Sequence, residues 1–305
     1  MSAEEHVALK KRAGQGPSAA YGLPAGAFFV AFALVPMVVV VLLSFMHWSG
    51  IAAPTWAGLA NWRDLARDAV THKAIWLTVK VMVLSWLVQT PLSILLGVYL
   101  ARQSRYRSVL GVLFMLPLLL SSTAIALIWK AVLDPNFGGV VYVFSKIGLQ
   151  KLAQGLLSSQ TLTLYTVVAV IAWQFIPLHS LLYRAAVRQI PAQLYEAARI
   201  DGATTRQQFI YLTLPQLRNT IVASSTLILV GSLTYFDVVY VLTGGGPANA
   251  TRLLPLDMYL NGFQKYSLGY ASVVAVILAA AGIALALGLS RFSGFGGMES
   301  DAEGA

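Results

Sequence analysis

Residues 195–215 read YEAARIDGATTRQQFIYLTLP and lie between two long apolar runs. The segment carries four charged side chains, whereas the whole chain of 305 residues is 57% hydrophobic and only 11% charged. A mean hydropathy of +0.70 is too high for an ordinary soluble domain and is typical of a polytopic membrane protein. The segment is therefore expected to connect two membrane-spanning helices, and the surrounding sequence indicates which side of the membrane it faces.

Six uncharged runs are long enough to cross the hydrocarbon layer, which takes about 20 residues in a helix. They are Ala25–Met46, Val81–Ala101, Ser108–Trp129, Leu162–Tyr183, Asn219–Phe236 and Tyr266–Ser290. The first run is too long for the apolar region of a signal peptide, and no small-residue cleavage pattern follows it. Prolines within the runs are expected to kink helices whose neighbours satisfy the freed backbone groups; they are Pro36, Pro91, Pro117 and Pro177. We therefore expect an all-α polytopic membrane protein with six transmembrane helices.

The distribution of charge predicts the orientation of these helices. Twelve of the 21 lysines and arginines fall on the side that holds both termini and the loops at 101–107 and 188–217. Because short cytoplasmic loops are enriched in Lys and Arg, we expect both termini and residues 195–215 to be cytoplasmic. The chain then divides into a cytoplasmic arm (1–20), a six-helix transmembrane domain (21–292) and a cytoplasmic tail (293–305).

Three longer segments connect the helices on the opposite side, at 47–74, 132–160 and 243–265. The net charge of +9 does not indicate nucleic-acid binding, because no soluble basic face is available to carry it.

Several kinds of catalytic site are excluded by the sequence. The chain has no cysteine, so it forms no disulfide and uses no thiolate. None of its eight lysines is followed by Ser or Thr, as an ATP-binding phosphate loop of the Walker A type requires. We expect no catalytic residue, no metal site and no bound cofactor in this chain.

Residues 195–215 have the start and stop signals of two short helices. Pro191 suits the first position of a helix, and Asp201-Gly202 supplies a left-handed stop that glycine tolerates. Within the first helix, Leu194, Ala197 and Ala198 share one face and leave a flat apolar strip.

The second helix is expected to begin with a capping box. Thr204 or Thr205 is followed three residues later by a glutamine. This helix would carry Phe209 and Leu212 on one side and end at Pro215. Two interpretations remain open: a simple link between spans, with Glu196 and Arg199 paired locally, or a surface on which another protein docks. A link alone would need only a few residues.

The same segment resembles the EAA loop of permease subunits of bacterial ABC importers, in which E-A-A, three residues, G, nine residues and I-x-L-P follow one another. Here Leu212 stands where that family usually has isoleucine, which keeps an apolar side chain. The resemblance implies a type I ABC importer permease fold and a coupling loop that sits in a cleft of a separate ATPase. The implied coupling residues are Glu196, Ala197, Ala198, Asp201, Gly202, Leu212, Leu214 and Pro215.

Two further stretches resemble the carbohydrate-uptake branch, the maltose- and glycerol-phosphate-type permeases. They are Trp56–Trp62 (WAGLANW) and Tyr240–Pro247 (YVLTGGGP). The stretch from Leu116-Pro117 to Trp129, with Asp134-Pro-Asn-Phe-Gly138 after it, resembles the family's third span and the loop that follows it. The resemblance covers about residues 25–290 and implies a sugar importer, without indicating which sugar.

The resemblance also implies a set of partners. These are a second permease, two copies of an ATP-binding subunit that hold ATP and Mg, an extracytoplasmic substrate-binding protein, membrane lipid and the sugar itself. The implied location is the bacterial cytoplasmic membrane.

Four side chains in the fourth and fifth runs could line the substrate pathway. Trp173, Gln174 and Tyr235 could offer a stacking face and hydrogen bonds to a hydroxylated ligand. Asp237 is an ionisable group near the hydrocarbon layer and for that reason a functional candidate. For each residue the alternative is structural, either packing between helices or an interfacial carboxylate bonded to a neighbouring span.

A secondary transporter of a small polar solute is the alternative function, because six spans would also suit such a carrier. Secondary transporters often combine inverted repeats with carboxylate or ion sites near the membrane midplane. The runs of this chain hold almost no acidic residues away from their ends, and that reading leaves the spacing in residues 195–215 unexplained.

Overall fold

The computed structural model describes residues 19–102 and 104–291. Nearly all of the predicted cytoplasmic arm and the whole of the predicted tail lie outside the described residues. The described part is almost entirely helical, and its one sheet is the antiparallel pair β1 (Met46–His47) and β2 (Thr55–Trp56). The predicted all-α class is confirmed.

Four helical stretches are long and apolar enough to cross a membrane. They are α2–α3 (Leu23–Leu43, including the π turn Val30–Leu34), α5 (Ala69–Ala101), α10 (Leu162–Gln189) and α17 (Leu268–Ser290). Two bent pairs complete the predicted six if each pair forms one span. These pairs are α6 (Arg105–Leu119) with α7 (Ser122–Val132), bent by 99°, and α14 (Arg218–Gly231) plus Ser232–Thr234 with α15 (Asp237–Thr243), bent by 51°.

The third run, expected as one span kinked at Pro117, consists of two separate helices, α6 and α7. The chain is extended at Leu120 (ψ 147°), three residues after Pro117. Ser121 then begins a new helix, because its Oγ accepts a hydrogen bond from the Ala124 amide at 3.2 Å. A serine N-cap favours a fresh helix start over continuation of the preceding helix.

The predicted boundaries on the opposite side are also corrected. Helix α5 begins at Ala69, twelve residues before Val81, because Asp68 caps it by accepting from the Val70 amide at 2.9 Å. The segments expected as connections contain helices of their own. These are α4 (Ala60–Arg67), α8 (Gly139–Lys146), α9 (Gln150–Ser158), α16 (Leu254–Tyr259) and the π turn η5 (Leu260–Gln264).

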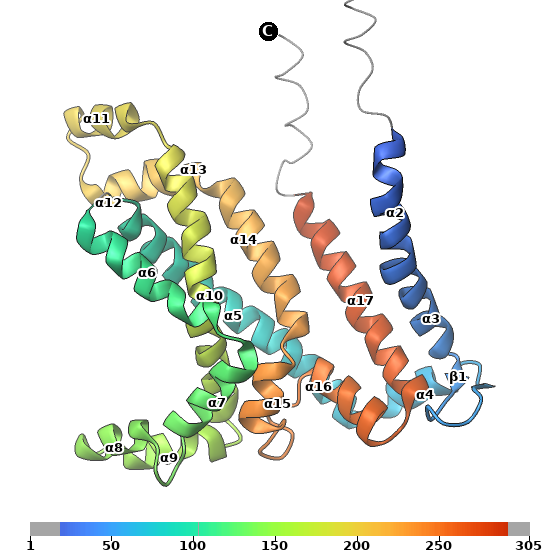
Figure 1. The fold of residues 1–305 in the computed structure, drawn as a ribbon. Coiled ribbons are helices and arrows are strands. Elements are labelled where there is room, and N and C mark those ends of the chain that lie inside the picture. Colours follow the sequence, from blue (N-terminus) through green and yellow to red (C-terminus); the bar gives the residue numbers. More distant parts are fainter. Residues whose placement is uncertain (1–18, 103, 292–305) are drawn as a thin grey trace, which may run out of the picture.

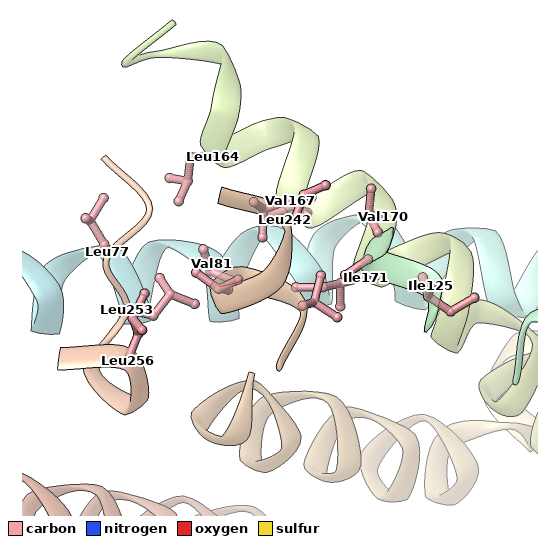
Figure 2. Packing of buried hydrophobic residues seen from close by; sticks show 14 of the residues in the cluster. Leu77, Val81, Ile125, Leu164, Val167, Val170, Ile171, Leu242, Leu253 and Leu256 are labelled. Atoms are coloured by element: carbon pink, nitrogen blue, oxygen red, sulfur yellow. The ribbon is translucent and has the colours of Figure 1, made fainter. Parts of the chain in front are cut away.

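The hydrophobic core lies around the crossing of α5 and α10, where α7, α15 and α16 pack against them (Figure 2). Leu77 and Val81 of α5 lie among the buried leucines and valines of the other helices. At Gly97 a side chain would have no room, since a Cβ atom would lie 2.7 Å from the Tyr183 Cβ and 2.8 Å from the Ser180 carbonyl oxygen. The two central helices therefore touch through backbone at this point.

The molecule has two distinct ends along its helix axes (Figure 1). The connection made by α11 (Ala192–Ile200), α12 (Thr205–Gln207) and α13 (Leu214–Gln216) lies at one end, and α8, α9 and α16 lie at the other. The predicted coupling segment is therefore separated from the long connections by the length of the helices.

Candidate functional site

The first part of the coupling segment is a short helix with a tight stop. Gly202 has φ +76°, the left-handed conformation expected of it. The Ala203 amide donates to the Ala198 carbonyl at 2.8 Å, a six-to-one bond of the Schellman type. Pro191 differs from the expectation, because it is the residue before α11 and not its first position.

The second part begins with the predicted capping box, formed by Thr204 and Gln207. The Gln207 amide donates to Thr204 Oγ1 at 3.3 Å, and the Thr204 amide donates to Gln207 Oε1 at 2.8 Å. The helix does not end at Pro215 but continues as a π turn, η3 (Gln208–Thr213), and α13. The helix stop at Gly202 and the N-cap at Thr204 are two residues apart, and together they fix the angle between the two parts of the segment.

The segment is anchored on the spans. Phe209 and Leu214 pack against a buried cluster of Ile94 (α5), Tyr183 (α10) and Leu217. The Tyr195 hydroxyl of α11 and the Thr213 hydroxyl are hydrogen-bonded at 3.0 Å, with either atom able to donate. A displacement of α11 would therefore be passed on to three spans through packed side chains.

Several large apolar side chains of the segment are exposed. Ile200 is 86% exposed and Tyr211 is 77% exposed, and Leu194 and Glu196 are also exposed. Glu196 makes no ion pair with Arg199, whose Nε donates instead to the Tyr195 carbonyl; the one ion pair in residues 19–102 and 104–291 is Arg252–Asp257. Sequence reasoning missed Ile200 and Tyr211, although both are large apolar residues inside a polar segment.

The four candidate pathway residues lie in different environments. Trp173 is half exposed and packs edge-on against Trp129 at 5.4 Å between ring centroids. Gln174 is buried and donates through Nε2 to Ser122 Oγ at 3.2 Å. Tyr235 is half buried and stacks on Phe175. Asp237 is exposed at the bend between α14 and α15.

No hydrogen bond, ion pair or ring contact within the described part of the chain joins any two of these four residues. Two larger groups of side chains lie on helices α5, α15 and α16.

The first group is a polar stripe on α5 that sequence reasoning missed. It consists of Ser85, Gln89, Thr90 and Ser93. Both side-chain polar atoms of Gln89, the hydroxyls of Ser85 and Thr90, and the Gln174 carbonyl oxygen are buried with no partner at hydrogen-bond distance among the described residues. The Tyr235 hydroxyl lies close to Gln89 and Ser85. Inside a membrane each unsatisfied hydrogen-bond donor or acceptor destabilises the protein by several kcal/mol. Their i, i+4 and i+8 spacing was the signal available in the sequence.

The second group is an aromatic ladder of four rings. Phe236 directly precedes α15, Tyr240 is on α15, Tyr259 is on α16 and Phe263 is on η5. The contacting rings have centroids 5.0–5.5 Å apart. Tyr240 is 38% exposed and Phe263 is 60% exposed, so the ladder is accessible at these two rings, and Asp237 follows Phe236 directly in the chain. Exposed aromatic faces with adjacent polar groups can bind the apolar side of a sugar ring.

A buried polar network holds the helix ends opposite the coupling segment together. Asp257 is fully buried and pairs with Arg252 at 2.7 Å. Its other carboxylate oxygen accepts from Thr71 at 2.8 Å and from Asn261 at 3.2 Å. The network connects α5 to α16 and stabilises this end of the molecule.

Residues 89–293 match the family described as binding-protein-dependent transport system inner membrane component. A probable ABC transporter permease protein of Pyrococcus horikoshii is 33% identical over 255 residues, which cover 82% of this chain and 85% of that protein. The multiple sugar-binding transport system permease protein MsmF of Streptococcus mutans is 32% identical over 254 residues, which cover 82% and 85%.

Among solved structures, the fold resembles that of a bacterial alginate ABC transporter, determined in complex with an alginate pentasaccharide-bound periplasmic protein. The TM-score is 0.78 with 24% identity, over 90% of this chain and 93% of the other. This likeness concerns the fold and agrees with the arrangement of helices described above. The family match covers the coupling segment, α10 and the bent fifth pair, and it displaces the alternative of a secondary transporter. The chain is a multi-pass membrane protein that belongs to the binding-protein-dependent transport system inner membrane components, the permease subunits of ABC importers.

Proposed function

We propose that this chain is one of two permeases of an ATP-driven sugar importer, and that a separate ATPase docks on its coupling segment. The observation that carries the proposal is the set of exposed apolar side chains on a doubly capped segment that is anchored on the spans. Exposed apolar patches rimmed by polar groups mark protein contact sites. ATP and Mg would be held by two copies of the ATPase subunit.

Glu196 is the charged centre of the proposed contact. It is exposed and has no partner of opposite charge in the residues described. A basic side chain of the ATPase would form a charge-assisted hydrogen bond with it, which contributes about 1.5–3 kcal/mol. Closure of the ATPases would then pull on α11 and tilt the spans to which Phe209 and Leu214 are anchored.

Sugar is the proposed substrate class. Streptococcus mutans MsmF is named as part of a multiple sugar-binding transport system, and the alginate transporter of similar fold takes a polysaccharide. The unpartnered amide of Gln89 could bind sugar hydroxyls, and the aromatic ladder could bind ring faces. Trp173, Gln174, Tyr235 and Asp237 remain candidates for the same pathway.

An extracytoplasmic binding protein would deliver the sugar to the end formed by α8, α9 and α16. This arrangement requires the coupling segment and both termini to be cytoplasmic, with the chain in the cytoplasmic membrane. The alginate transporter was determined with its periplasmic protein bound, which supports a partner of this kind.

A comparison of the partners captured by the wild-type chain and by the Glu196→Lys variant tests the proposal. The tagged chain is purified from its native host in gentle detergent, and co-purifying proteins are identified by mass spectrometry. We expect the wild type to retain an ATPase and a second permease, and Glu196→Lys to lose the ATPase and sugar uptake while retaining the second permease.

Asp64→Lys is the matched control, because Asp64 is an exposed acidic residue on α4, away from the coupling segment. It should leave capture and uptake unchanged. An ATPase that is retained by Glu196→Lys, with normal uptake, would refute the docking role. A chain that is purified alone and still transports sugar would refute the proposal that it is a subunit of an ATP-driven importer.

A further inference from the structure

A cavity of about 750 Å³ lies between the coupling segment and the adjoining ends of α5, α6 and α10. The ends of these helices carry the first charged residues after long apolar runs, so the cavity is at the depth of the lipid headgroups. Its walls come from four separate elements, which distinguishes it from a groove along one helix.

Among the described residues, four arginines and no acidic residue line the cavity. They are Arg102, Arg107, Arg188 and Arg199. None of them forms an ion pair within the part of the chain that the structure describes. Four unpaired guanidinium groups around one space repel each other, and an anion bound between them would relieve that repulsion.

Local contacts orient three of these side chains. The Nε atom of Arg188 donates to the Ala101 carbonyl at 3.3 Å, and that of Arg199 donates to the Tyr195 carbonyl at 3.2 Å. The guanidinium of Arg107 lies over the Tyr99 ring at 4.8 Å from its centroid. These contacts leave the terminal nitrogens of Arg188 and Arg199 available, and a planar fork of such donors suits a phosphate group.

The remaining wall of the cavity is apolar and continues outward along α5. Leu95 and Tyr99 line the cavity and are themselves 57% and 44% exposed. Leu92, one helical turn before Leu95, is 48% exposed and extends the same stripe toward the middle of the membrane. The site therefore has a cationic pocket at the headgroup depth and an apolar track that leads from it into the hydrocarbon layer.

We propose that this cavity binds the headgroup of an anionic phospholipid, such as phosphatidylglycerol, with an acyl chain along Leu95 and Leu92. Basic pockets between transmembrane helices on the cytoplasmic side are a known form of lipid recognition. The bound phosphate would contact α5, α10 and, through Arg199, the coupling segment. The lipid would thus stabilise the position of α11 against the spans.

Native mass spectrometry of the full-length chain, together with any subunits that co-purify, tests this proposal. The protein is washed free of bound lipid in detergent and titrated with phosphatidylglycerol or, in parallel, with phosphatidylcholine. We expect phosphatidylglycerol to bind at least tenfold more tightly. The double variant Arg102→Gln/Arg188→Gln should lose that preference at an unchanged unfolding temperature.

The control is Arg105→Gln/Arg218→Gln, which removes the same charge from two exposed arginines that do not line the cavity. It should keep the preference for phosphatidylglycerol. Equal loss in both double variants, or equal binding of the two lipids, would overturn the proposal. Displacement of the lipid by inorganic phosphate at the same concentration would assign the cavity to a soluble anion. Unchanged lipid binding with loss of a captured ATPase would make it a protein contact.

Discussion

At the scale of single residues, Gly97 is the position where the two central helices leave least room. A Cβ atom there would lie 2.7 Å from the Tyr183 Cβ and 2.8 Å from the Ser180 carbonyl oxygen. Because backbone cannot give way as a flexible side chain can, we expect Gly97→Ala to destabilise the protein by about 1–3 kcal/mol. Thermal unfolding in detergent measures this loss.

The control is Gly288→Ala. Gly288 is also inside a long helix, α17, but apart from the backbone of its own helix no described atom lies within 4 Å of the position its Cβ would take. Alanine favours helix over glycine by about 0.8–1.0 kcal/mol, so this variant should be neutral or slightly more stable. Equal effects of the two changes would contradict the close contact between α5 and α10.

The Arg252–Asp257 pair gives a second prediction. Replacing Arg252 by alanine leaves a fully buried carboxylate without its cation, which costs about 3–5 kcal/mol. We expect a correspondingly lower unfolding temperature, whereas Arg63→Ala on the exposed face of α4 should have little effect. A stable Arg252→Ala protein would mean that Thr71 and Asn261 alone suffice to hold Asp257.

Residue roles were predictable where they depend on local chemistry. The left-handed Gly202 and the capping box of Thr204 follow from residue types a few positions apart, and the structure has both. The contact between Asp257 and Thr71 joins residues 186 positions apart, so no local pattern could indicate it. The roles assigned to Glu196 and Asp237 stay predictions, because they depend on partners and substrate.

At the scale of elements, the break in the third span depends on the cap at Ser121. Its Oγ accepts from the Ala124 amide and satisfies a backbone group at the start of α7. Ser121→Ala should therefore cost about 0.5–2 kcal/mol of stability, as N-cap replacements typically do. Ser145→Ala is the control, since Ser145 is exposed and only donates to the carbonyl three residues earlier. If both variants unfold alike, the cap does not determine the break.

Counting uncharged runs located the spans but not their shape. Hydropathy measures whether a segment can enter the membrane, and it is the same for a straight helix and for two helices bent by 99°. The early start of α5 was missed for the opposite reason, because Lys73 and Lys80 interrupt the apolar run while the helix continues. Helix geometry at these points is set by caps and packing, which hydropathy does not measure.

At the scale of the whole molecule, the two bent pairs decide the topology. If both pairs cross the membrane, the coupling segment lies on the same side as the α5–α6 turn. If α6 and α7 instead return to the side from which they entered, α10 runs in the opposite direction and the coupling segment lies outside. The fold favours the crossing arrangement, because the turn between α5 and α6 lies at the same end of the molecule as the coupling segment. Arg188 Nε donates to the Ala101 carbonyl at 3.3 Å, and Arg102 lines one cavity together with Arg199.

Single cysteines distinguish these topologies directly, because the natural chain has none. Suitable positions are Ile51 (88% exposed), Tyr106 (66%), Phe137 (94%) and Ile200 (86%). A membrane-impermeant maleimide applied to intact cells should label cysteine at 51 and 137, while cysteine at 106 and 200 should react only after the membrane is opened. Labelling of 51 and 200 from outside, with 106 and 137 protected, would mean that α6 and α7 form a re-entrant pair. The coupling segment would then face away from any cytoplasmic ATPase, and the proposed docking would fail on geometry alone.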